Sequence, residues 1–170
     1  MLASGPRIFV SYARSDGKAF ARRLSERLRA EGFSLWRDLA DMEGGRDWWQ
    51  QIEETIRAVE YLILVITAAA LRSEYVRKEW RFARQEGRCV IPVLADKDLT
   101  GSEAFRALPG WMQRAHFVDA DDPEQATRLL RTLEKPCEVR RVPFMAGDRP
   151  AGYVERPRET EALIGHLVHG

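Results

Sequence analysis

One glutamate, Glu79, combines a carboxylate with an aromatic neighbour at helical spacing. It follows Tyr75 by four residues, in a segment where Val76, Trp80 and Ala83 recur as one apolar helix face. This spacing predicts a carboxylate at the edge of the buried stripe, partly removed from water. Such a group can stabilise a developing positive charge or hold the hydroxyl groups of a ligand. It can also be a boundary residue satisfied by an arginine or a backbone amide, and its position alone favours this structural interpretation.

Three further side chains are candidates for ligand contacts, and Trp49 is a candidate for contact with a partner. Tyr12 and Arg14 follow the first apolar run. Tyr12 either completes strand packing or offers a ring for stacking, while Arg14 is either solvated or pairs with an anion. Trp48 is either a core anchor beside Ile52 or a wall of a ligand site. Trp49 points elsewhere, and we expect it to be exposed unless it meets a partner.

The sequence offers no set of metal ligands. No His, Cys, Asp and Glu residues have metal-site spacing, so we predict no metal. Cys89 and Cys137 are too few and too separate for a disulfide framework, and Cys89 lies in an apolar run typical of a small core residue. We therefore expect reduced cysteines and a cytoplasmic location.

Charge and hydropathy argue against two classes of partner. The chain has 27 Lys and Arg against 26 Asp and Glu, a formal net charge of +1, which predicts no bulk attraction to nucleic acid or anionic lipid. The longest apolar stretch, Tyr61 to Leu71, is far shorter than the ~20 residues that span a bilayer. We predict neither direct nucleic-acid binding nor membrane insertion.

Short apolar runs alternate with helix-period segments along the chain. This alternation predicts an α/β fold, a flavodoxin-like open sheet of about five parallel strands with helices on both faces. The uninterrupted run Tyr61–Ile66 predicts a central strand, and Pro92 predicts an edge or the end of pairing. The strands are expected at 8–12, 33–36, 61–66, 89–94 and 116–118, and the helices at 15–31, 48–59, 73–85 and 123–133.

Helix ends and ligand position follow from the same pattern. Ser15 and Ser73 are expected N-caps, and Gly32 and Gly87 are expected to end their helices.

Parallel sheets bind ligands outside the carboxyl ends of their strands. Neither the dinucleotide motif GxGxxG nor the P-loop motif is present. Ser11-Tyr12-Ala13 and Thr67-Ala68-Ala69 stand where a response-regulator receiver would have its paired acids and its phosphoacceptor aspartate, which argues against that class.

Five segments, taken in order, resemble a Toll/interleukin-1 receptor (TIR) domain. The match covers roughly Arg7 to Leu133, and the long polar loop before Trp48 corresponds to the BB loop of the family. The segments are Ile8-Phe9-Val10-Ser11-Tyr12, the loop from Asp38 through Gly45 into Trp48 and Ile52, Leu64-Val65-Ile66-Thr67, Ser73 to Trp80, and Ile91-Pro92-Val93.

The resemblance implies one of two functions. Some TIR domains are scaffolds that self-associate and recruit partners; others cleave NAD⁺ at the nicotinamide–ribose bond with a glutamate of the third helix. Glu79 after Tyr75 matches the cleaving class. Glu43-Gly44-Gly45 replaces the Pro-Gly of receptor-type BB loops, and no Phe-Trp box follows, which weakens the scaffold alternative. The resemblance thus favours a catalytic Glu79.

The implied reaction suits a single carboxylate and needs no cofactor, because NAD⁺ is the substrate. The pyridinium leaves as neutral nicotinamide, so no general acid is required, and a carboxylate stabilises the charge that develops on the ribose. The resemblance also implies a role for Arg14 beside the diphosphate. The expected substrate contacts are Tyr12, Ala13, Arg14, Gly45, Trp48 and Tyr75.

TIR enzymes resemble one another in completing the site with a neighbouring protomer. The loop from Asp38 to Asp47 is long, polar and glycine-containing, so we expect a slow isolated domain that homotypic TIR–TIR association activates. Met42, Arg46 and Trp49 are the expected contacts for self-association.

The chain is expected to divide near residue 135. Residues 1–135 form the TIR domain, and residues 136–170 form a proline- and glycine-containing linker and a short helix at about 158–168. This tail resembles the lead-in to the nucleotide-binding module of bacterial STAND ATPases. We therefore expect the N-terminal part of a longer signalling or defence protein.

Overall fold

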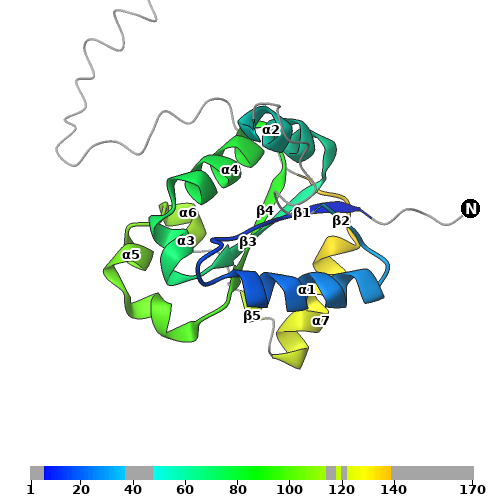
Figure 1. Cartoon of the computed structure of the whole chain (residues 1–170). Coiled ribbons are helices and arrows are strands. Elements are labelled where there is room, and N and C mark those ends of the chain that lie inside the picture. The colour runs from blue at the N-terminus through cyan, green and yellow to red at the C-terminus, as the bar shows by residue number, and fades with distance from the viewer. Residues whose placement is uncertain (1–5, 37–47, 114–117, 120–121, 139–170) are drawn as a thin grey trace, which may run out of the picture.

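The computed structural model describes residues 6–36, 48–113, 118–119 and 122–138. These residues contain a five-stranded parallel sheet in the order β2-β1-β3-β4-β5, which confirms the predicted fold class (Figure 1). The strands are β1 (Arg7–Ser11), β2 (Ser34–Trp36), β3 (Tyr61–Ile66), β4 (Cys89–Leu94) and β5 (Val118–Asp119).

Helices cover both faces of the sheet. Helices α1 and α7 lie on one side, and α2, α3 and α4 lie on the other (Figure 1). The helices are α1 (Lys18–Ala30), α2 (Trp48–Ala58), α3 (Ala68–Arg72), α4 (Glu74–Gln85), the 3₁₀ helix η2 (Lys97–Gly101), α5 (Glu103–Arg106), α6 (Gly110–Gln113) and α7 (Pro123–Leu133). The short helices α3, η2, α5 and α6 were not predicted, because segments this brief lack a clear period.

The central strand supplies both hydrophobic cores, as its continuous apolar run predicts. All six residues of β3 are buried. Successive side chains of a strand point to opposite faces, so Leu62, Leu64 and Ile66 pack under α2 and α4. Tyr61, Ile63 and Val65 pack against α1 and α7. Strands β1 and β4 flank β3, as expected.

Most of the predicted helix ends are confirmed. The Ser73 hydroxyl accepts from the Val76 amide at the start of α4, and Gly32 and Gly87 follow α1 and α4 with positive φ angles. The prediction for Ser15 is wrong, because the cap of α1 is Gly17. A further turn, closed by the Gly17 amide on the Ala13 carbonyl at 2.8 Å, separates β1 from the helix.

Pro92 lies inside the sheet, so its assignment to an edge strand is wrong. Strand β4 lies between β3 and β5, and Pro92 is opposite Leu64 of β3. On the other side, the described residues of β5, Val118 and Asp119, pair with Val93 and Leu94. Pro92 has no N–H, so it donates no backbone hydrogen bond to either neighbouring strand.

The expectation of two reduced cysteines is also wrong. Cys89 and Cys137 form a disulfide with a Cα–Cα distance of 5.8 Å. The two cysteines are close because the segment after α7 returns to the beginning of β4. Their separation of 48 positions along the chain gave no sign of this. The Tyr61 hydroxyl reinforces this attachment by donating to the Lys135 carbonyl at 2.7 Å, and burial raises the pKa of this phenol. A cytoplasmic location remains a proposal. The disulfide weighs against it, because disulfides are uncommon in reducing compartments.

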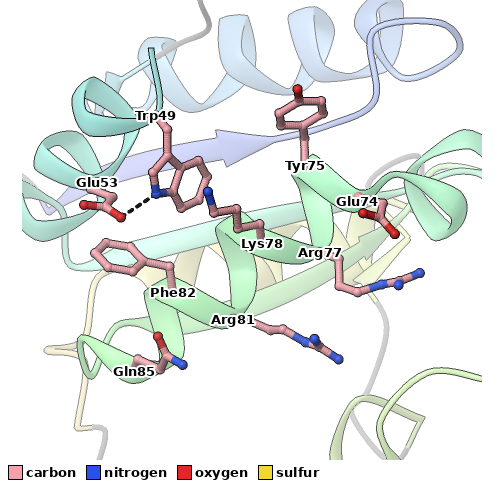
Figure 2. Close-up of a pocket in the computed structure, with 9 residues that line it drawn as sticks. All are labelled: Trp49, Glu53, Glu74, Tyr75, Arg77, Lys78, Arg81, Phe82 and Gln85. Carbon is pink, nitrogen blue, oxygen red and sulfur yellow. Dashed lines mark hydrogen bonds between the residues drawn. The ribbon is translucent and has the colours of Figure 1, made fainter. Parts of the chain in front are cut away.

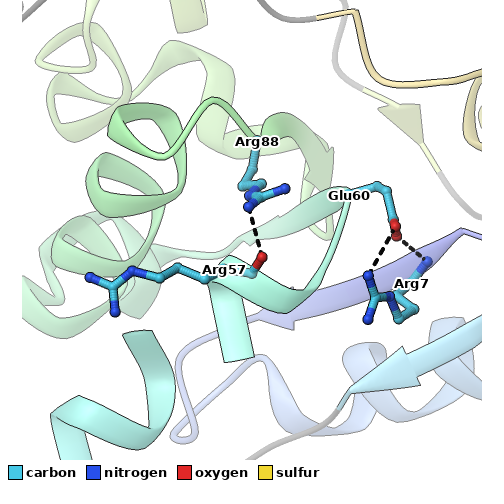
Figure 3. Close-up of polar contacts among 4 residues, drawn as sticks. All are labelled: Arg7, Arg57, Glu60 and Arg88. Carbon is cyan, nitrogen blue, oxygen red and sulfur yellow. Dashed lines mark hydrogen bonds and ion pairs between the residues drawn. The ribbon is translucent and has the colours of Figure 1, made fainter. Parts of the chain in front are cut away.

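Polar contacts also join the elements at the amino ends of the strands (Figure 3). The Arg7 amide donates to the Glu60 carboxylate at 2.6 Å, and the two side chains form an ion pair at 3.3 Å. Arg88 donates to the Arg57 carbonyl at 2.7 Å. This end of the sheet therefore holds structural contacts.

Within the described residues, no helix is long and apolar enough to cross a membrane.

The disulfide yields a stability prediction. It joins residues 48 positions apart, so Cys137→Ser should lower the free energy of unfolding by up to about 4 kcal/mol through loop closure. Urea denaturation with and without a thiol reductant measures this effect. The Cys137→Ser variant is the control and should not respond to the reductant. Equal midpoints for the wild-type chain in both conditions would contradict the prediction.

Candidate functional site

The candidate catalytic glutamate lies at the carboxyl end of β1. Ser11, the last residue of that strand, donates its hydroxyl to Glu79 Oε2 at 2.6 Å. Both residues are buried, with 1% and 9% of their surfaces exposed. The predicted removal of Glu79 from water is correct. The Ser11 hydroxyl is a partner of this carboxylate that the sequence did not predict.

Helix α4 places this carboxylate by presenting one continuous face to the sheet. Val76, Trp80 and Ala83 are buried on that face, and Glu79 lies at its edge, on the side of Tyr75. Glu79 is therefore at the boundary of the packed face, as the spacing predicts, and is itself buried there. Ser11 alternates with Phe9, whose side chain belongs to the core under α2 and α4, so its hydroxyl points toward α4.

Two of the predicted substrate contacts, Trp48 and Tyr75, come together in the structure. The rings of Trp48 and Tyr75 meet edge to face, with centroids 4.8 Å apart and planes at 80°. Tyr75 is one helical turn before Glu79, and 61% of its surface is exposed. An exposed ring at this position can stack on a planar ligand.

The residues after Ser11 are divided between two surroundings. Tyr12 is half-buried, and Ala13 is buried in the core under α2 and α4. Arg14 is exposed and lines an open hollow of about 650 Å³ beside α1, together with Lys18 and Arg22. Arg14 therefore lines a hollow to which neither Trp48 nor Tyr75 contributes. Gly45, Met42 and Arg46 lie outside the described residues.

Trp49 was expected to be exposed, and this expectation is wrong. Its ring is half-buried against Phe82, with centroids 6.1 Å apart, and Lys78 Nζ lies 3.6 Å from its centre. The indole N–H donates to Glu53. Because α2 packs alongside α4, the side of α2 that carries Trp49 faces a second helix rather than water.

A groove of about 930 Å³ lies over this contact between α2 and α4 (Figure 2). Lys78 lies against Trp49 there, while Arg77 and Arg81 point away from the ring. Tyr75 lines the groove, but Glu79 does not. We therefore place the candidate catalytic site at the carboxyl end of β1 rather than in this larger hollow.

Sequence reasoning missed a polar network at the same edge of the sheet. The two carboxylate oxygens of Asp16 accept from the Thr67 hydroxyl at 2.7 Å and from the Ala69 amide at 2.9 Å. This joins the loop after β1 to the beginning of α3. Gly17 fits the loop because a Cβ there would lie 2.9 Å from the Ala13 carbonyl oxygen. The one available signal was Thr67, a capping residue type directly after a buried strand.

The described residues include no group of three or more His, Cys, Asp and Glu side chains that could hold a metal ion. Arg84 lies 3.9 Å from the ring centre of Trp111, and burial lowers the pKa of its guanidinium. This cation–π contact joins α4 to α6 and serves packing.

A family model described as TIR domain matches residues 8–133, and the chain belongs to this family. It is 30% identical over 97 residues to NAD(+) hydrolase SARM1 of Danio rerio, covering 52% of this chain and 14% of that protein. It is 25% identical over 133 residues to NAD(+) hydrolase TcpA of Theionarchaea archaeon (strain DG-70-1), covering 75% of this chain and 35% of that protein. The chain thus spans a minor part of both curated relatives.

Solved structures agree with this assignment of the fold. The TIR domain of the Toll-related receptor TRR-2 from Hydra magnipapillata superposes with a TM-score of 0.62 at 17% identity, over 75% of this chain and 98% of that one. A metazoan TIR-STING receptor from C. gigas gives a TM-score of 0.59 at 22% identity, over 76% and 40%.

The Asp16 network yields a second stability prediction. Asp16→Ala removes the acceptor of two hydrogen bonds and should lower the free energy of unfolding by about 1–2 kcal/mol. Asp98→Ala is the matched control, because Asp98 is an exposed aspartate of η2, and it should change stability by less than ~0.5 kcal/mol. Urea denaturation compares the two variants. Equal stability of both variants would show that the network does not hold the loop.

Proposed function

We propose that this chain hydrolyses NAD⁺ at the nicotinamide–ribose bond, with Glu79 as the catalytic residue, in a signalling or defence protein. The observation that carries the proposal is the buried Glu79 carboxylate at the carboxyl end of β1, one helical turn from the exposed ring of Tyr75. The names of the curated relatives, which are NAD(+) hydrolases, point in the same direction.

The chemistry follows from charge. The bond between the ribose carbon and the pyridinium nitrogen breaks with its electron pair going to nitrogen, so nicotinamide leaves neutral. Positive charge then develops on the ribose, where the Glu79 carboxylate stabilises it or holds the ribose hydroxyls. Burial strengthens this attraction because the effective dielectric constant is lower than in water. Water then bonds to the ribose carbon and releases a proton, giving ADP-ribose; a ring nitrogen of the adenine would instead give a cyclic isomer.

Charge removal at Glu79 tests this mechanism. Glu79→Gln keeps the shape and an oxygen that can accept from Ser11, so the melting temperature should not change. Nicotinamide release should fall by about a hundredfold or more, because the amide cannot stabilise the cation. The assay is chromatographic measurement of free nicotinamide.

Glu74→Gln is the matched control for this variant. Glu74 lies on the same helix but is exposed in its first turn, so its substitution should leave activity near that of the wild-type chain. A Glu79→Gln variant that cleaves NAD⁺ as fast as the wild-type chain would reduce Glu79 to a structural residue and remove the enzyme proposal.

Self-association is proposed as the activating step. Tyr75 has 61% of its surface exposed, so the aromatic pair that it forms with Trp48 is open to a partner, and Trp36 of the edge strand β2 is also exposed, at 48%. A neighbouring protomer packed there would complete the wall and orient the substrate. Met42 and Arg46 remain proposed contacts, whereas Trp49 could contribute only together with the Lys78 that covers it.

Activity should therefore depend on assembly. Fusing the chain to a tetrameric carrier should raise nicotinamide release per protomer by more than about tenfold over the dilute chain. The control is the same fusion carrying Glu79→Gln, which should stay inactive. Equal specific activity of the dilute and clustered chains would contradict the composite site even where cleavage occurs.

The alternative function is a non-enzymatic TIR–TIR interaction scaffold. The exposed Trp36 and Tyr75 favour it as much as they favour a composite active site, because exposed aromatic rings are typical of contact surfaces. A clustered chain that forms defined oligomers but releases no nicotinamide would establish the scaffold instead.

A further inference from the structure

We propose that Ser11 is a positioning residue that fixes the Glu79 carboxylate for NAD⁺ cleavage. The inference rests on the proposed function and assigns Ser11 a role that acts through Glu79 rather than on the substrate. Its basis is the 2.6 Å hydrogen bond between two buried side chains that are 68 residues apart in sequence.

The donor and the acceptor both belong to rigid elements. Ser11 is paired with Leu64 of the central strand, so its backbone is fixed by the sheet. Glu79 is in the middle of α4, at the edge of the face that packs against that sheet. A hydrogen bond between two such elements selects one orientation of the carboxylate, which a bond from a mobile loop would not do.

The chemical type of the donor also matters. A buried carboxylate needs a hydrogen-bond donor to remain charged at low cost. An arginine or a lysine in the place of Ser11 would supply one, but its positive charge would cancel the field that must stabilise the ribosyl cation. A serine hydroxyl is neutral, so it orients the carboxylate without adding a positive charge beside it.

A second buried serine provides the matched control. Ser25 of α1 is 0% exposed, and its hydroxyl oxygen has no hydrogen-bond partner among the described residues. It lies on the opposite side of the sheet, where α1 packs. Ser25→Ala therefore makes the same chemical change in a buried site without touching Glu79.

The test compares Ser11→Ala, Ser11→Thr, Ser11→Cys and Ser25→Ala in the full chain clustered on the tetrameric carrier. Ser11→Ala should lower kcat by about ten- to hundredfold and leave KM for NAD⁺ within about twofold, because the substrate loses no direct contact. Ser11→Thr retains the hydroxyl and should recover most of kcat. Should the added methyl group prevent folding, Ser11→Cys, with its weaker donor, should give an intermediate kcat. Ser25→Ala should behave as the wild-type chain.

The outcomes separate this inference from the proposed function. Full activity of Ser11→Ala beside an inactive Glu79→Gln would overturn the role of Ser11 alone. If Ser11→Ala and Ser11→Thr are both folded and lose the same amount of kcat, the role of Ser11 is overturned as well. The retained hydroxyl of the threonine would then make no difference to the rate. A clustered wild-type chain that releases no nicotinamide would overturn both proposals. Melting temperatures of every variant distinguish loss of positioning from loss of fold.

Discussion

The burial of the Glu79 carboxylate is the constraint on which the account of this chain depends. A charged group with 9% of its surface exposed is unfavourable in an apolar core unless a donor satisfies it, and the Ser11 hydroxyl supplies one at 2.6 Å. The register of β1 against β3 and the buried face of α4 must both be correct for these atoms to meet. The fold therefore holds this carboxylate through its most buried elements.

The two ends of the sheet have different roles. At the amino ends of the strands, the disulfide, the Tyr61 hydroxyl and the ion pair of Arg7 with Glu60 join secondary-structure elements to one another. At the carboxyl ends, the polar side chains of Ser11 and Asp16 connect strands and loops around the edge where parallel sheets bind ligands. Structural contacts at one end leave the other end available for a site.

Local periodicity predicted the fold because each element carries its own signal. The continuous run of β3 indicated a strand buried on both faces, and the helical spacing around Glu79 placed it near the core. What could not be predicted were contacts between distant segments. Cys137 reaches Cys89 only because α7 returns to the sheet, and Trp49 is covered because α4 packs beside α2. Ser11 was visible as a polar residue in an apolar run, but its partner required the three-dimensional arrangement.

The most direct test of the central claim, the proposed cleavage of NAD⁺ at the nicotinamide–ribose bond, is to follow NAD⁺ incubated with the clustered chain. Proton NMR of the reaction follows the pyridinium ring protons and the anomeric proton of the attached ribose in one time course. Cleavage beside a buried carboxylate predicts that free nicotinamide signals grow as those of the bound ring disappear, while the diphosphate and the adenine–ribose bond stay intact. An unchanged NAD⁺ spectrum, or cleavage at the diphosphate, would contradict the account.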